Sequence, residues 1–84
     1  MRGDVKEIVG LLMRCLGGEE VTVGEIEASS FEADGPLHDA LNRAYIELLE
    51  FAHDREARAR DRGLDRTRRA ALEAALGEIV REAG

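Results

Sequence analysis

The chain has 84 residues and a formal net charge of −6, and 44% of its residues are apolar. This length allows one domain, residues 1–84, with a thin core, and the acidic balance disfavours general nucleic-acid binding. The single cysteine excludes an internal disulfide, and no segment approaches the ~20 apolar residues of a membrane span. We therefore expect a cytoplasmic protein that does not bind membranes.

Near the N-terminus, four apolar residues recur at helical spacing: Val5, Ile8, Leu12 and Cys15. Asp4 and Glu7 fit a capping box, with Asp4 before the first turn and Glu7 within it. Gly17-Gly18 is typical of a helix end. The pattern predicts a helix over residues 5–16. On this stripe, Cys15 is interpreted as a small buried apolar side chain.

The next stretch, residues 19–34, carries six acidic side chains and no basic one. Thr22 followed by Glu25 fits a second capping box, which predicts a short acidic helix over residues 23–29. A stub of strand is the alternative, and it is less favoured because no partner strand is visible elsewhere. Phe31 is expected to anchor the following loop on the core.

The longest predicted element is a helix over residues 36–62. It begins after Asp34-Gly35, because proline at position 36 suits the first helical turn. Its first half is rich in apolar residues, whereas no large apolar side chain follows Ala52 until Gly63, where we expect the helix to end.

A last helix is predicted over residues 66–83, with Asp65 as its cap. The two long helices predict an antiparallel hairpin, covered by the helix over 5–16 and by the acidic segment, and hence an all-α fold. Ala52 and Leu72 should lie nearly opposite each other in the hairpin. The residues between them would then form a polar tip that projects ~15 Å beyond the core.

This tip is rich in arginine: residues 55–69 hold seven arginines against three acids. Arg55, Arg58 and Arg62 share one face of a continuous helix and could grip phosphates or carboxylates. Alternatively, acids placed four residues before arginines, as in Asp54/Arg58, only stabilise an exposed helix. Both interpretations stay open.

The helix over 36–62 is apolar over a wider arc than one neighbour covers. Leu49 widens the stripe, and Ile46 falls almost opposite its centre. Because chains this short often need oligomerisation to complete a core, we expect a homodimeric bundle with Ile46 and Leu49 as partner-binding candidates.

Glu50 and His53 form an E-x-x-H motif, which places a carboxylate and an imidazole on one helical face. Di-iron carboxylate bundles use two such motifs with further carboxylates, so a symmetric dimer could double the single one here. The alternative is a solvated helix face. Glu50 and His53 are therefore only weak metal candidates, and we expect no cofactor.

Residues 5–28, with the stretch Thr22-Val23-Gly24-Glu25-Ile26, resemble the opening of winged helix-turn-helix regulators, in which an apolar helix precedes a T-x-G-E-[LI] helix start. That resemblance implies DNA binding through a recognition helix that follows. The chain departs from the family at this point, because residues 29–35 read as a short acidic loop, and acidic side chains repel phosphates.

No nucleophile lies near a histidine, and no glycine-rich phosphate loop is present. We therefore expect a small non-enzymatic interaction or adaptor protein that acts as a homodimer. The alternative is a nucleic-acid-associated regulator that uses the arginine-rich tip, although the charge makes nucleic acid an unlikely partner. A dimeric carboxylate/histidine metal-binding bundle is the third possibility.

Overall fold

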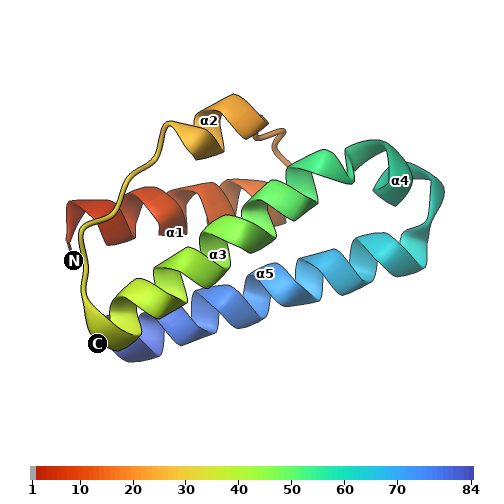
Figure 1. The fold of residues 1–84 in the computed structure, drawn as a ribbon. Helices are drawn as coiled ribbons and strands as arrows, with labels where there is room; N and C mark the ends of the chain where they lie inside the picture. Colours follow the sequence, from red (N-terminus) through yellow and green to blue (C-terminus); the bar gives the residue numbers. More distant parts are fainter. Residues whose placement is uncertain (1) are drawn as a thin grey trace.

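The computed structural model describes residues 2–84, and these residues form helices and loops without a strand. The helices are α1 (Gly3–Leu16), α2 (Val23–Glu27), α3 (Gly35–His53), α4 (Arg55–Arg60) and α5 (Arg62–Ala83). The predicted all-α fold is confirmed. The two long helices, α3 and α5, pack along each other, α1 lies against both, and α2 covers α3 (Figure 1).

The core is one cluster to which all helices except α4 contribute. Its largest fully buried side chains are Ile8, Leu12, Ile26, Leu41, Leu48, Leu72 and Ile79. Because a single chain encloses these side chains, a second subunit is not needed to bury them, and the homodimer stays a prediction. No helix among residues 2–84 is both long and apolar enough to cross a membrane.

The end of α1 and the start of α2 follow the predicted capping chemistry. Gly18 has a φ of 91°, and the Glu19 amide donates to the Arg14 carbonyl at 2.9 Å. Glycine favours this left-handed conformation because it has no Cβ. The Thr22 hydroxyl accepts a hydrogen bond from the Glu25 amide at 3.1 Å and so begins α2.

The first turn of α1 differs from the prediction, because the helix begins at Gly3 and Asp4 lies inside it rather than capping it. The Asp4 carboxylate accepts hydrogen bonds from the Glu32 amide at 3.0 Å and from Arg2 Nε at 3.1 Å. It therefore ties the loop before α3 to the start of α1.

The prediction of one helix over residues 36–62 is wrong, because the helix is interrupted at Asp54, between α3 and α4. The guanidinium of Arg58 donates two hydrogen bonds, of 3.1 and 2.9 Å, to the Phe51 carbonyl. In an unbroken helix this carbonyl would accept from the amide of Arg55. A side chain that inserts into the backbone ladder at such a point bends or ends a helix.

The second break lies at Asp61 and not at Gly63. The Asp61 carboxylate accepts from the amides of Gly63 at 2.9 Å and Leu64 at 3.1 Å, which are unpaired donors in the first turn of α5. The last helix therefore begins at Arg62, and the predicted roles of Gly63 as a helix end and Asp65 as a cap are both wrong.

Candidate functional site

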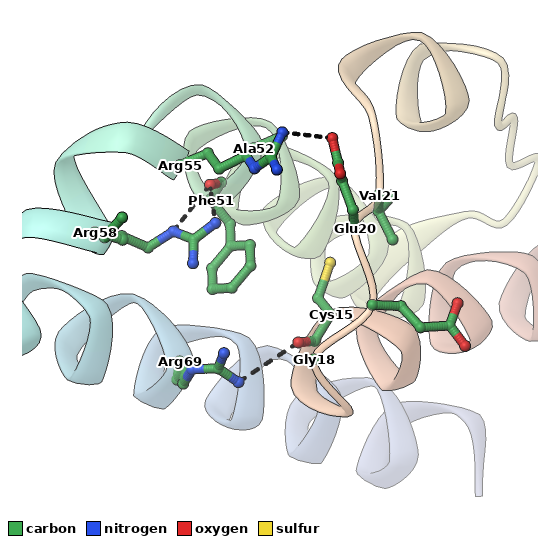
Figure 2. Close-up of a pocket in the computed structure, with 11 residues that line it drawn as sticks. Cys15, Gly18, Glu20, Val21, Phe51, Ala52, Arg55, Arg58 and Arg69 are labelled. Carbon is green, nitrogen blue, oxygen red and sulfur yellow. Dashed lines mark hydrogen bonds and ion pairs between the residues drawn. The ribbon is translucent and has the colours of Figure 1, made fainter.

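Where α4 leads from the end of α3 into α5 lies a hollow of about 360 Å³, which we call the arginine pocket. It lies where the C-terminal ends of α1 and α3 meet α4 and the first half of α5 (Figure 2). Its main lining side chains are Cys15, Val21, Phe51, Arg55, Arg58 and Arg69.

Arg58 closes one wall of this pocket. Its side chain is only 11% exposed, and besides the Phe51 carbonyl it donates to Asp65 Oδ1 at 2.9 Å. The guanidinium carbon lies 3.4 Å from the centre of the Phe51 ring, which is a cation–π contact. Arg58 therefore caps the negative C-terminal end of α3 and packs on the core at the same time.

Arg69 makes the corresponding contact with α1. It donates to the Leu16 carbonyl at 3.3 Å and to Asp65 Oδ2 at 2.9 Å. Two arginines thus neutralise the C-terminal ends of two helices, and the Asp65 carboxylate holds both arginines in place. The sequence did not assign this role to Asp65 and Arg69, because a spacing of four residues signals only a surface pair.

The Arg58 and Arg69 guanidiniums lower the pKa of Asp65 below its ordinary value of 3.8. Because the folded state holds this proton less readily than the unfolded chain, Asp65 stabilises the fold above the unfolded pKa. That contribution is lost as the pH falls through the lower folded pKa.

We expect Asp65→Asn to lower the melting temperature at neutral pH, with a difference from the wild type that shrinks below about pH 4. Thermal unfolding followed by circular dichroism between neutral and acidic pH measures this difference. Glu73→Gln is the control, since Glu73 is an exposed acid on the same helix. A constant difference between Asp65→Asn and the wild type across the range would contradict the assignment.

The pocket mouth is spanned by an ion pair between Arg55 Nη1 and Glu20 Oε1 at 2.6 Å. Both side chains are largely exposed, at 65% and 56%. This pair joins the arginine-rich tip to the acidic segment within one chain. Below it lies Cys15, whose thiol is buried and has a pKa raised by that burial.

Arg55 and Arg58 both lie on α4, but the break at Asp61 places Arg62 on α5, so the three arginines do not form one face of a continuous helix. Arg55 binds Glu20, Arg58 lies inside, and Arg62 is exposed at the start of α5. Among residues 2–84, no acidic side chain forms an ion pair with three exposed tip arginines, Arg60, Arg62 and Arg66.

The weak metal candidates lie near the end of α3. Glu50 accepts a hydrogen bond from Arg68 Nη1 at 2.9 Å, and His53 is exposed. Within residues 2–84, no three His, Cys, Asp or Glu side chains gather closely enough to hold a metal ion. Within this part of the chain, no third ligand of these types therefore lies beside Glu50 and His53.

The side of α3 that faces away from the core forms a second surface, which we call the outer face of α3. It is defined by Asp39, Asn42, Ile46 and His53. Ile46 is 47% exposed there. It borders a shallow hollow of about 260 Å³ that is also lined by Asp39, Asn42 and Arg43. The other partner-binding candidate, Leu49, is half-buried and packs against the core.

No family model, curated protein or solved structure matches this chain.

Proposed function

We propose that this protein is a small non-enzymatic interaction module that acts as an antiparallel homodimer through the outer face of α3. The observation that carries the proposal is Ile46, which is 47% exposed at the middle of this face. An exposed apolar residue beside a hollow on an otherwise polar helix face suits helix-on-helix contact.

The charge distribution supports an antiparallel arrangement. Residues 54–69 hold seven arginines and four acids, a net charge of +3, whereas the rest of the chain holds five basic and fourteen acidic side chains, a net charge of −9. The acids Glu32, Asp34 and Asp39 surround the start of α3, at the opposite end of that helix from the arginine-rich tip. A two-fold axis at Ile46 brings each acidic end towards the partner's tip.

The size of the face limits the strength of this dimer. The nineteen residues of α3 span ~28 Å. One pair of crossing helices of this length buries less than the ~1,600 Å² of a standard interface. We therefore expect a weak dimer, in which apolar contact at Ile46 supplies most of the affinity and charge sets the orientation.

Sedimentation of the wild type at increasing concentrations up to about 1 mM should show a shift from 9.2 kDa towards twice that mass. We expect Ile46→Glu to stay monomeric, because it buries two like charges at the two-fold axis. Val80→Glu is the matched control, since Val80 is 54% exposed on α5 and should leave the dimer intact. A monomeric wild type, or equal effects of both variants, would refute this interface.

The alternative of a nucleic-acid-associated regulator is supported by the exposed arginines Arg60, Arg62 and Arg66. It is opposed by the net charge of −6, which repels a phosphate backbone. The dimer uses the same arginines without that penalty, since they meet the acidic end of a second copy. We therefore rank the homodimeric module first.

A further inference from the structure

The arginine pocket has two kinds of wall. One is apolar and consists of Val21, Phe51, Ala52 and Ala59. The other is charged, because Arg55, Arg58 and Arg69 border the same hollow together with Glu20 and with Glu19, which is paired with Arg14 at 2.8 Å. In Figure 2 the Phe51 ring and the Cys15 thiol lie on either side of this space, and the Arg55–Glu20 pair lies across its edge. A volume of about 360 Å³ lies within the range of small-molecule sites.

The charges around the pocket are not fixed equally. Asp65 lies between Arg58 and Arg69 and is bonded to both. Glu20, in contrast, is 56% exposed on the loop between α1 and α2, and one ion pair holds it to Arg55. Exposed ion pairs of this kind contribute little to stability. The Glu20 carboxylate is therefore the replaceable anion of the site.

We propose that the arginine pocket binds a small carboxylate with a compact apolar body, and that Glu20 occupies the carboxylate position until this ligand arrives. The ligand's carboxylate takes the place of Glu20 against Arg55, whose planar guanidinium matches a carboxylate with two parallel hydrogen bonds. Its apolar body packs mainly on Ala52 and Ala59, the more exposed members of the apolar wall, and removes their surface from water.

The two walls together select this ligand class. A phosphate ion binds the guanidiniums but leaves the apolar wall exposed to water. It also carries more charge than Arg55 alone neutralises, because Arg58 and Arg69 are already paired with Asp65. A neutral aromatic compound covers the apolar wall but leaves Arg55 paired with Glu20. Only an apolar acid uses both walls. This site does not depend on the proposed dimer, because every residue in it belongs to one chain.

Benzoate is a suitable probe, and benzamide is its neutral counterpart of the same shape. In a titration followed by two-dimensional amide NMR, we expect saturable benzoate shifts at Val21 and Ala52. Benzamide should bind about tenfold or more weakly, since it lacks the charge-assisted hydrogen bonds, and inorganic phosphate should not saturate. A dipeptide that ends in phenylalanine, with a free or an amidated C-terminus, tests whether the bound carboxylate belongs to a peptide C-terminus. If the free form binds more tightly than benzoate, the ligand is a peptide terminus. If it binds more weakly, the ligand is a free small acid.

Two exposed side chains allow a test that does not threaten the fold. Arg55→Gln should weaken benzoate binding by about tenfold, whereas Glu20→Gln should strengthen it, because the internal competitor is gone. Arg62→Gln is the control, as it removes an arginine outside the pocket. Equal affinities for benzoate and benzamide, or weaker benzoate binding in Glu20→Gln, would overturn the proposal.

Discussion

Replacing Leu48 with alanine should lower the free energy of unfolding by about 2–5 kcal/mol. Leu48 is fully buried in α3, inside the core that α1, α3 and α5 enclose. Truncation removes apolar contacts and leaves a cavity that packed helices fill only in part. The total free energy of unfolding of a small domain is only ~5–15 kcal/mol. Urea denaturation followed by circular dichroism should therefore show a transition at a much lower urea concentration than in the wild type.

Ile46→Ala is the matched control, because Ile46 lies on the same helix but is 47% exposed. At protein concentrations too low for dimers, its effect should stay within about 0.5 kcal/mol of the wild type. If both variants unfold at the urea concentration of the wild type, Leu48 is not in the core and the orientation of α3 is wrong.

The difference between Leu48 and Ile46 follows from sequence periodicity alone. Positions spaced three and four residues apart share one face of a helix, so the apolar stripe that includes Leu41, Leu48 and Phe51 predicts the buried side of α3. The cap signals at Gly17-Gly18 and Thr22 were also correct. Those at Asp4 and Asp65 were not, because the Glu32 amide and Arg58 engage these two carboxylates instead. The overall all-α fold was predictable from the same helical spacing of apolar residues.

The arginine pocket was not predictable, because its contacts join residues that are far apart in the chain. Arg69 reaches Leu16 across 53 positions, and Arg55 reaches Glu20 across 35. Neither contact leaves a periodic signal. The helix break at Asp54 was hidden for a related reason, since local helix propensity is high there and only the inserted Arg58 side chain interrupts the backbone ladder.

Surface ion pairs show the same limit. Of three acid-first pairs at a spacing of four residues, Asp54/Arg58, Glu56/Arg60 and Asp65/Arg69, the last is formed within the described residues 2–84. Asp54 binds Arg68 on α5 instead, at 2.8 Å, and Arg58 binds Asp65. Tertiary partners replace local ones because the chain turns at Asp54, so the tip is held by contacts between α3, α4 and α5 rather than by its own helix propensity.

Arg58→Met should therefore destabilise the protein by about 1–3 kcal/mol, even though it lies in a segment that reads as solvated. Methionine keeps a long apolar side chain against Phe51 but donates no hydrogen bond. The Phe51 carbonyl at the end of α3 then loses both of its guanidinium donors, and Asp65 retains only Arg69. Urea denaturation measures the loss of stability, and hydrogen exchange at the α4 amides should rise with it.

Arg62→Met is the control for this variant, because it makes the same substitution at an exposed position at the start of α5. We expect it to change the free energy of unfolding by less than about 0.5 kcal/mol. If the tip were only a solvated helix, Arg58 and Arg62 would be equivalent, and the two variants would unfold together. A clear separation between them would instead mean that the arginine-rich segment is bound to the core through Arg58, which leaves Arg62 and its exposed neighbours as the part of the tip that can meet a partner.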